Sequence, residues 1–546
     1  MLRAVVPNRI AAFPFASASR IVCAMLGTMI DRARVAVRSS PGWFAALVAA
    51  LAWAAWLRVA QAAAPVVFDE YASIFFSRHG FGQLWGAWML RETNPPLFYS
   101  LLKLWRMAVP DDVLALRLLP LGIDMAQIAL LAGFAWRRYG PAAAVLAVMV
   151  VACSASDIYH APYLRGYGLS KLAVTVSFIG LVRALDGDGE GGTGRRGWIA
   201  FAGGAVVAIY CHTTMLIWPL VAGAALAIDA LLAPGESRAR WRQLLLAGVA
   251  ILIASAWVLT QGVMQLRGHN PNINWIEPLD LDDFVSSVNL QLLLDGTIGS
   301  VAMVALMAAG TVRTAGTRAT RLALLSLVLG VAAFKACDAV HPIISDYTLH
   351  WASPFSAWLA GAAVARGGGE ALRRGVPRAL RIATVAGMAL LGRWALATEA
   401  YISHPQDWQA SIRRVAATPQ AAMLVSHESI GVVVQQACMI EFHAATCPFP
   451  LVVMANPAPT DSWAFGGYRG PIVSPFGVRR ALGKAETVFA FSRYVYRPLD
   501  PFGLDKGDYD ETLWDDGELI GPIPVSHFDV RPFSRPPIPD PPPDPD

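Results

Sequence analysis

Long apolar stretches separated by short polar loops make up most of the first 400 residues of the chain. They run over about 44–62, 96–109, 113–135, 141–155, 168–184, 198–211, 214–232, 244–264, 299–312, 320–337, 349–365 and 379–397. Most of them approach the roughly 20 residues that a helix needs to cross a hydrocarbon core. The pattern predicts an α-helical polytopic membrane protein with about 11–13 transmembrane helices.

The composition agrees with this interpretation. Of the 546 residues 55% are hydrophobic and 15% are charged, whereas charged residues make up roughly a quarter of ordinary soluble domains. The net charge of +5 is small, so it does not indicate a nucleic-acid partner, and the lipid bilayer is the expected surrounding.

Basic residues cluster in alternate loops, which the positive-inside rule places in the cytoplasm. The longer loops between them, about 63–95, 156–167, 265–298 and 338–348, are therefore expected to face outward, as in a bacterial-type inner (plasma) membrane. The basic clusters are Arg32, Arg34 and Arg38; Arg137 and Arg138; Arg195 and Arg196; Arg238, Arg240 and Arg242; Arg313, Arg318 and Arg321; and Arg373, Arg374, Arg378 and Arg381.

The segment 96–109 is short, and it creates a parity problem. If 96–109 and 113–135 both crossed the membrane, every later basic loop would lie outside. We therefore expect 96–109 to be partial or re-entrant and the number of crossings to be odd, which delivers the end of the chain to the outer face.

The chain divides into four parts. Residues 1–43 form a cytoplasmic N-terminal segment, and 44–397 form the membrane domain. Residues 398–530 read as a small extracytoplasmic α/β domain, because helical spacing around Trp408 is followed by short strand-like runs. Residues 531–546, rich in proline, read as a disordered tail.

The loop 63–95 carries the strongest local signal for chemistry. Adjacent acids, Asp69 and Glu70, follow the first apolar stretch, and Trp85 and Trp88 share what would be one helical face. The loop ends in ETNPPLFY, in which the prolines indicate that a new helix begins near Pro95 or Pro96. The amino end of such a helix can bind a phosphate, because its backbone N–H groups are free.

These residues resemble the GT-C glycosyltransferases, in particular the protein-mannosyltransferase, aminoarabinose-transferase and RgtA-like relatives. The FDE of residues 68–70, followed by E-x-N-P-P-L-F-Y, looks like the first exoplasmic loop of that group. Shorter matches agree: Arg165-Gly166-Tyr167, Tyr210-Cys211-His212-Thr213, Trp275-Ile276-Glu277-Pro278 and Asp407-Trp408. The chain departs from the pattern at Asn94, Tyr163 and Asp346, which bears on the donor contacts and the substrate.

The resemblance implies an inverting transfer of a sugar from a polyprenyl-phosphate donor to a hydroxyl acceptor, which is a glycan, a lipid or a protein. The reaction needs a base and positive charge for the departing phosphate. The expected catalytic residues are Asp69 as the base, with Glu70 and Glu92 beside it. The expected donor phosphate-binding residues are Arg165, Tyr167, His212 and Lys335. A divalent cation held by Asp69 and Glu92 is a further option.

Several alternatives stay open at this point. His212 also reads as a packed histidine and Lys335 as a snorkelling side chain. Arg117 and Asp124, both within an apolar run, are expected to form a mutual salt bridge. Cys438 and Cys447 form either a bridge or, as the sequence favours, two buried thiols.

Two other functions compete with glycosyl transfer. A polytopic transporter or lipid flippase would have inverted repeats and ionisable groups near the middle of the membrane, and neither is evident in the sequence. A membrane scaffold with an exported binding domain is the third hypothesis, in which the acidic loop marks only the topology.

Overall fold

The structure is a computed structural model. It describes residues 40–529, apart from 188–192, 233–237, 269–275, 277, 295, 346, 366–376, 399–405, 455–467, 469, 494–501, 503, 505–508 and 515–516. The Pro-rich tail, nearly all of the N-terminal segment, Trp275, Glu277 and Asp346 therefore lie outside the described residues.

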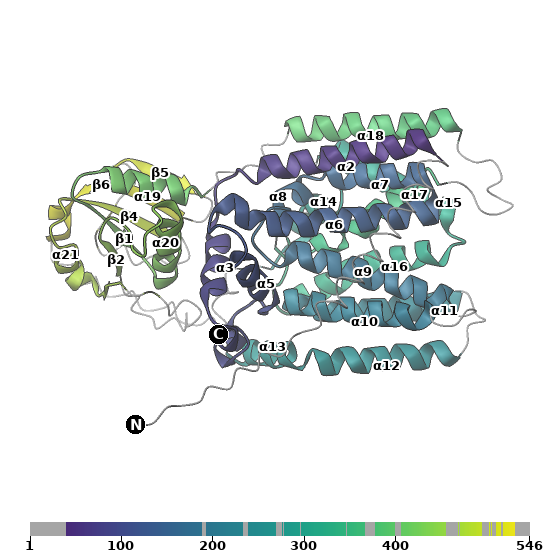
Figure 1. Ribbon diagram of the computed structural model, residues 1–546, viewed down its shortest axis with the longest axis horizontal. Coiled ribbons are helices and arrows are strands. Elements are labelled where there is room, and N and C mark those ends of the chain that lie inside the picture. Colours follow the sequence, from purple (N-terminus) through teal and green to yellow (C-terminus); the bar gives the residue numbers. More distant parts are fainter. Residues whose placement is uncertain are drawn as a thin grey trace, which may run out of the picture.

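A bundle of long helices forms the larger part of the molecule (Figure 1). Among the described residues, six helical segments are long and apolar enough to cross a membrane, or seven if α12 and α13, bent by 62° at their junction, form one span. The helices of the bundle are α2 (Pro41–Gln61), α6 (Val113–Tyr139), α7 (Pro141–Cys153), α9 (Tyr167–Asp186), α10 (Thr193–Cys211), α11 (Ile217–Leu232), α12 (Arg238–Ala254), α13 (Ala256–Gly268), α15 (Thr297–Thr314), α16 (Arg318–Asp338), α17 (Ser353–Ala362) and α18 (Arg378–Thr398).

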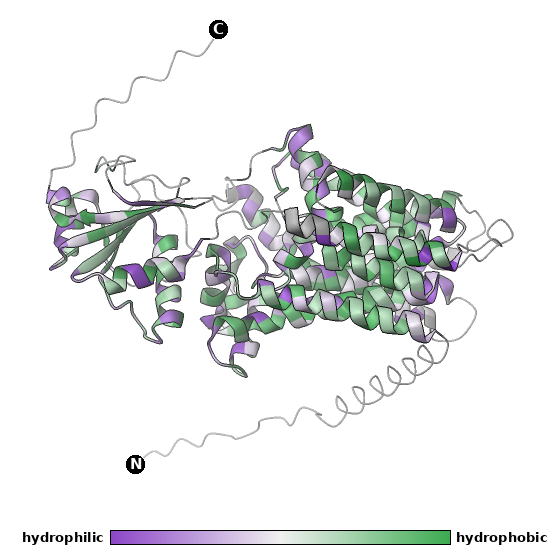
Figure 2. Ribbon diagram, turned by 90° about the horizontal axis from the view of Figure 1, so that it is seen from above, coloured by the Kyte–Doolittle hydropathy of each residue, from purple (hydrophilic) through white to green (hydrophobic). Residues whose placement is uncertain are grey.

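The elements follow the predicted apolar stretches closely, and Figure 2 shows hydrophobic residues along most of the bundle. The protein is thus a mostly helical polytopic membrane protein with a small sheet-containing domain. The predicted total of about 11–13 crossings is larger than the six or seven segments that satisfy both length and composition, and it stays a prediction.

Short helices fill the end of the bundle that faces the sheet (Figure 1). They are α3 (Phe68–Arg78), α4 (Phe81–Leu84), η1 (Ala87–Arg91), α5 (Leu97–Arg106), α8 (Ala155–His160), η2 (Thr213–Leu216), α14 (Leu281–Leu292) and η3 (His350–Ala352). Helix α5 has ten residues, so it is about 15 Å long and too short to cross a bilayer. The predicted helix start beside Pro96 is confirmed, and the short length of α5 agrees with the prediction that segment 96–109 does not cross.

Trp85 and Trp88 do not share a helical face, which corrects the prediction. The chain breaks between α4 and η1 at Gly86, which has an extended backbone. A Cβ at Gly86 would lie 2.6 Å from the carbonyl oxygen of Gly82, so only glycine permits this close return. As a result Trp85 contacts Tyr210 and Trp257, whereas the Trp88 ring packs on helix α3.

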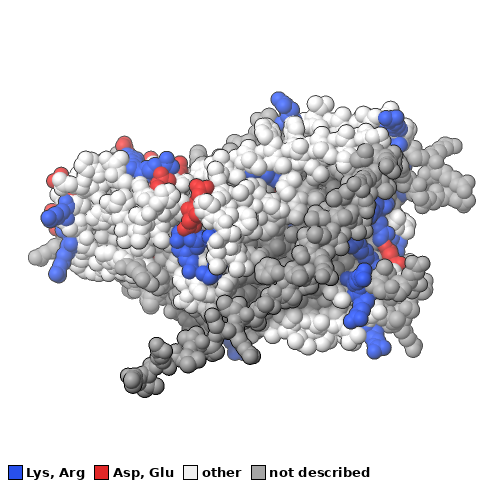
Figure 3. Space-filling view, viewed as in Figure 1, with Lys and Arg blue, Asp and Glu red and all other residues white. Residues whose placement is uncertain are grey.

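Arginines gather at the other end of the bundle. Arg138 at the end of α6 pairs with Asp186 at the end of α9. Arg318 at the start of α16 reaches both Leu185 O and Asp229. These contacts place the basic loops side by side, and Figure 3 shows Lys and Arg at the bundle end that lies farthest from the sheet.

The carboxyl-terminal domain contains a six-stranded sheet of order β3-β2-β1-β4-β6-β5. Strands β1 to β4 are parallel, and β6 and β5 are added in antiparallel fashion. Helices α19 and α20 cover one face, and α21 covers the other. The bounds are α19 (Trp408–Ala417), β1 (Ala421–Val425), α20 (Glu428–Glu441), β2 (Leu451–Met454), β3 (Ile472–Val473), η6 (Pro475–Gly477), α21 (Val478–Ala481), β4 (Thr487–Arg493), β5 (Glu511–Trp514), β6 (Gly517–Pro524) and η8 (Val525–Asp529).

Helix α3 and the α/β domain share one hydrophobic core. Tyr71 and Phe76 of α3 belong to the same buried cluster as Trp408 and Val434 of the domain. The side chain of Arg78 donates a hydrogen bond to Gln436 Oε1 at 2.7 Å across the junction. The loop that carries Asp69 is therefore held between the two domains.

Cys438 and Cys447 are joined by a disulfide, so the favoured expectation of two buried thiols was wrong. Cys438 lies on the last turns of α20, and the following loop turns back so that the two Cα atoms are 5.1 Å apart. Such a return depends on tertiary packing and is not visible in the spacing of the residues.

Candidate active site

Asp69 and Arg165 form an ion pair at the end of the bundle that faces the α/β domain. Asp69 lies in the first turn of α3, and Arg165 lies in the loop between α8 and α9. Arg165 Nη2 is 2.6 Å from Asp69 Oδ1, with the Asp69 side chain 29% exposed and that of Arg165 8% exposed. Burial opposes the charge of Arg165, yet the Asp69 carboxylate raises the pKa of Arg165 above its usual value.

Arg165 is anchored by Tyr99, and one nitrogen of its guanidinium is left without a partner among the described residues. Its Nη1 donates to the Tyr99 hydroxyl at 2.8 Å, while its buried Nε has no hydrogen-bond partner in the part of the chain that the structure describes. Gly166 allows this loop to lie against α10, because a Cβ there would be 2.9 Å from the carbonyl oxygen of Cys211. A guanidinium held in this way can bind an oxyanion.

Glu92 lies near the same pair. Its side chain is buried, and burial raises its pKa from 4.5 to about 6, although the nearby charge of Arg165 acts in the opposite direction. The Thr93 hydroxyl donates to Glu92 Oε1 at 3.2 Å. The amides of Gln261 and Gln265 on α13 both donate to the Glu92 carbonyl oxygen, which fixes this stretch of the loop against the bundle.

Glu70 turns away from Asp69. Its carboxylate accepts two hydrogen bonds from Arg117, at 3.0 Å from Nε and 2.6 Å from Nη2, and one from the Leu164 N–H at 3.2 Å. Arg117 also donates to the carbonyl oxygens of Ala62, Ala64 and Pro65. This buried pair ties the start of α3 to α6 and to the loop that carries Arg165.

The expected salt bridge between Arg117 and Asp124 is wrong. The two residues are seven positions apart on α6, and each binds a different element. Asp124 instead pairs with Arg58 of α2 at 2.6 Å and with Lys171 of α9 at 2.8 Å.

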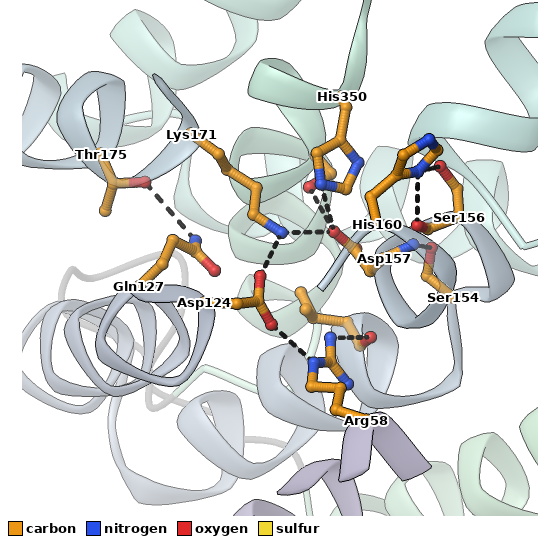
Figure 4. Close-up of polar contacts among 12 residues, drawn as sticks. Arg58, Asp124, Gln127, Ser154, Ser156, Asp157, His160, Lys171, Thr175 and His350 are labelled. Atoms are coloured by element: carbon orange, nitrogen blue, oxygen red, sulfur yellow. Dashed lines mark hydrogen bonds and ion pairs between the residues drawn. The ribbon is translucent and has the colours of Figure 1, made fainter. Parts of the chain in front are cut away.

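An ionic network extends from Asp124 to other helices (Figure 4). Lys171 pairs with Asp157 at 2.6 Å, and Asp157 in turn lies 3.4 Å from His350 Nε2. Arg58, Lys171, Asp124 and Asp157 are all almost fully buried, so two cations balance two carboxylates. Each charge contacts a partner from another helix, as buried ions require.

Aromatic rings line the space between this network and Arg165. Tyr167 stacks on Tyr347 with ring centroids 4.3 Å apart, and its ring is 5.7 Å from that of His212. Tyr163 stacks on Tyr167 at 6.0 Å. Burial lowers the pKa of His212 to about 4, so the imidazole is neutral at pH 7.

Lys335 occupies a different place. Its Nζ donates to the carbonyl oxygen of Leu279, lies 3.4 Å from Asp338 and sits over the Phe284 ring. It lines an otherwise apolar pocket of about 710 Å³, whose other lining residues are Phe284, Val328, Val331, Ala332, Ala336 and Ala339. No contact joins Lys335 to Asp69 or Arg165 among the described residues.

The residues near Asp69 fit a divalent cation poorly. A hard cation needs about six oxygen ligands, whereas the Arg165 guanidinium already contacts Asp69. Within the described ranges, no three Cys, His, Asp or Glu side chains lie together as ligands of one metal ion. We therefore derive no step through a metal.

Sequence reasoning named five residues that the structure groups around Arg165: Asp69, Glu92, Arg165, Tyr167 and His212. It missed Tyr99, although this residue ends the quoted stretch ETNPPLFY. It also missed Tyr347 and the two α13 glutamines, for which a single sequence offers no local signal.

The comparisons with known proteins rest on structure alone. No family model and no curated protein sequence matches the chain. The structure is similar to ArnT from Cupriavidus metallidurans in the apo state, with a TM-score of 0.56, 13% identity and coverage of 90% of this chain and 99% of that one. ArnT bound to undecaprenyl phosphate matches with the same TM-score and identity over 89% and 99%.

This chain has the GT-C fold. The structure shows a weaker likeness to the Archaeoglobus fulgidus oligosaccharyltransferase, with a TM-score of 0.46 and 11% identity over 84% of this chain and 70% of that one. The GT-C fold accounts for the arrangement of the helical bundle, while the function depends on the residues placed on it.

Proposed function

We propose that this protein is an integral membrane glycosyltransferase that moves a hexosyl or pentosyl unit from a polyprenyl-phosphate donor to a hydroxyl acceptor, with inversion. The observation that carries the proposal is the Asp69–Arg165 ion pair, at 2.6 Å, beside the buried Glu92. A carboxylate that can act as a base is therefore in direct contact with a guanidinium that can bind an oxyanion. The GT-C fold supports the reaction class by analogy.

The transfer is a single displacement. The Asp69 carboxylate takes the proton of the acceptor hydroxyl as its oxygen attacks the anomeric carbon of the sugar. The bond between this carbon and the phosphate oxygen breaks, and its electron pair leaves with the phosphate. Because the leaving phosphate is anionic, it needs positive charge and no proton, and the Arg165 guanidinium supplies that charge.

The other polar residues have supporting roles in this proposal. The buried Nε of Arg165 is the donor that remains for the phosphate, and Tyr167 and His212 form the wall beside it. Glu92 binds the acceptor hydroxyl. Glu70 is a positioning residue, because Arg117 occupies its carboxylate.

A polyprenyl carrier suits the apolar surroundings. The similar ArnT structure contains undecaprenyl phosphate, which supports a lipid phosphate as the donor here. Lys335 lines a separate apolar pocket and has no described contact with Arg165, so the proposal leaves the donor phosphate to Arg165.

The charge distribution supports an outward-facing site. Arginines gather at the bundle end that lies away from the sheet, and the positive-inside rule places that end in the cytoplasm. Asp69 and the α/β domain are then extracytoplasmic. For a bacterial-type chain, the membrane is the inner (plasma) membrane.

The transporter hypothesis gains no support from the buried charges. Arg58, Asp124, Lys171 and Asp157 are paired, neutral in sum and almost inaccessible to solvent. A transport pathway would instead present ionisable groups to a water-filled cavity.

The test is turnover of a polyprenyl-phosphate sugar by purified protein. We expect Asp69→Asn to lower the rate by two to four orders of magnitude, about the share that a general base contributes. Asp510→Asn, at a 78% exposed carboxylate of the α/β domain, is the matched control and should keep the full rate. Full turnover by a correctly folded Asp69→Asn protein would overturn the assignment.

A further inference from the structure

The four parallel strands of the α/β domain have the spatial order β3-β2-β1-β4. The chain moves outward in one direction from β1 to β2 and β3, then returns across the sheet to β4. The point between β1 and β4 is therefore a topological switch point. In open α/β sheets, ligands bind at the carboxyl ends of the strands at such a point.

Polar side chains gather at this position. Ser426 and His427 follow β1 directly, and Ser492 and Arg493 end β4. The two strand ends are joined by a hydrogen bond from Ser426 N–H to the Phe491 carbonyl oxygen at 3.1 Å. Ser426, His427 and Ser492 are buried, and Arg493 is half-buried.

The hydroxyl of Ser426 is the second observation that points to a ligand. Its Oγ is wholly buried and has no hydrogen-bond partner in the described part of the chain. A buried hydroxyl without a partner is destabilising, because it has lost its hydrogen bonds to water. That cost is avoided when a bound molecule accepts or donates the missing hydrogen bond.

The local charge selects an anion. Helix α20 has 14 residues and begins at Glu428, immediately after His427, so its amino end presents partial positive charge at the switch point. The Arg493 guanidinium adds a full positive charge from β4. Phosphate and carboxylate groups are the ligands that such a combination prefers.

This position adjoins the Asp69 loop. The Arg493 guanidinium lies 4.3 Å from the centroid of the Phe68 ring, and Phe68 immediately precedes Asp69. The Phe68 N–H donates to Gln406 Oε1 at 2.9 Å, which fixes the start of α3 against the domain. A molecule at the switch point can therefore extend towards Asp69.

We propose that the switch point between β1 and β4 binds an anionic group of the acceptor, a phosphate or a carboxylate, and so presents an acceptor hydroxyl to Asp69. That the bound molecule is the acceptor rests on the proposed glycosyl transfer. The donor reaches Asp69 from the helical bundle, where its lipid is buried. The sheet lies outside that bundle, beyond α3 (Figure 1), so the two molecules would approach Asp69 from different sides.

Binding is measured by isothermal titration of the full-length protein in detergent with three probes: mannose 6-phosphate, glucuronic acid and uncharged glucose. We expect the phosphate or the carboxylate probe to bind and glucose to bind at least about tenfold more weakly. Ser426→Ala should weaken the anionic probe by about tenfold or more. The phosphate and carboxylate titrations show which anion the site takes.

Thr487→Val is the matched control. Thr487 Oγ1 is also buried without a partner in the described residues, but it lies at the opposite, amino-terminal end of β4. Thr487→Val should leave the affinity unchanged. Arg493→Gln is a second variant that should weaken the anionic probes.

Two outcomes overturn the inference: neither anionic probe binds the unmodified protein, or Ser426→Ala binds them as tightly as the unmodified protein does. The proposed function fails separately. If Asp69→Asn retains transfer while Ser426→Ala loses binding, the anion site stands and only the chemistry at Asp69 is wrong.

Discussion

Asp69 and Glu70 are neighbours in the sequence, but their carboxylates pair with different arginines. Asp69 contacts Arg165 at 2.6 Å and is partly exposed, whereas Glu70 contacts Arg117 at 2.6 Å and is buried. Successive residues of a helix point about 100° apart, so one acid faces the proposed reaction space and the other faces the bundle. In the proposed reaction Asp69 therefore contributes to catalysis, whereas Glu70 contributes to stability.

Glu70→Gln should lower the stability of the protein, because it removes the charge that balances the buried Arg117. Breaking such a pair costs about 3–5 kcal/mol, which thermal unfolding in detergent would detect. Asp69→Asn is the control. Asp69 is 29% exposed, and Arg165 keeps its contact with Tyr99 and the nearby Glu92, so the midpoint should move less while turnover is lost. Equal midpoints for the two variants would contradict this division of roles.

Glu92 should make stability depend on pH. Its pKa is raised from 4.5 to about 6 by burial, so the folded protein holds this proton more tightly than the unfolded chain. The resulting stabilisation is complete below about pH 4.5 and is lost as the pH rises through 6, by about 2 kcal/mol in total. Relative to Glu92→Gln, the unmodified protein should therefore lose stability between pH 4.5 and 6.5. A constant difference between the two proteins across that range would refute the shift.

Lys171→Met should destabilise the bundle strongly, because Asp124 and Asp157 would both be left buried without this cation (Figure 4). We expect a loss of about 3–5 kcal/mol. The double variant Lys171→Met with Asp157→Asn restores charge balance and should recover part of the loss. If the single variant unfolds at the same temperature as the unmodified protein, the network does not stabilise the fold.

The Cys438–Cys447 disulfide should stabilise the α/β domain by about 2–3 kcal/mol, the amount expected for closing a loop with a sequence separation of nine. Reduction, or replacement of both cysteines by serine, should lower the unfolding midpoint. A reductant should have no effect on the double variant. Equal accessibility of both thiols to a maleimide without reduction would show that no bridge forms.

Cys337 reports the orientation of the membrane domain. It is exposed and lies on the last turn of α16, at the end opposite Arg318. A membrane-impermeant maleimide applied to the outer face should label Cys337. With Cys337 replaced by serine, a cysteine introduced at the exposed Arg196 should react only after the membrane is opened. The reverse pattern would place the site on the cytoplasmic side.

The positions of most bundle helices along the chain were readable from the sequence, because a helix in lipid must be apolar along a length set by the bilayer. The short length of α5 was predicted from the alternation of the basic loops, and its start was predicted from Pro96. The residues around Arg165 were also found, since Asp69, Glu92 and the Arg165-Gly166-Tyr167 stretch lie in loops that the basic clusters predicted to face outward. Their convergence, however, comes from α3, α9 and the loop before α5 meeting in space.

The partners of buried charges were not readable. Arg117 and Asp124 share one helix, yet Glu70 and Lys171 from other elements bind them. Pairing in the interior is decided by which helices pack together, and a single sequence does not contain that information. The same reason explains why the Cys438–Cys447 bridge and the role of Gly86 were missed.

Helix α3 and the α/β domain share one core, so neither can be removed without exposing buried side chains of the other. If the chain were cut before Trp408, Tyr71 and Phe76 would face water, and the segment carrying Asp69 would lose the surface that shapes it. Exchanging the carboxyl-terminal domain between relatives would therefore succeed only when residues 66–78 are transferred with it. A chimera that divides at residue 398 alone would combine two halves of different cores.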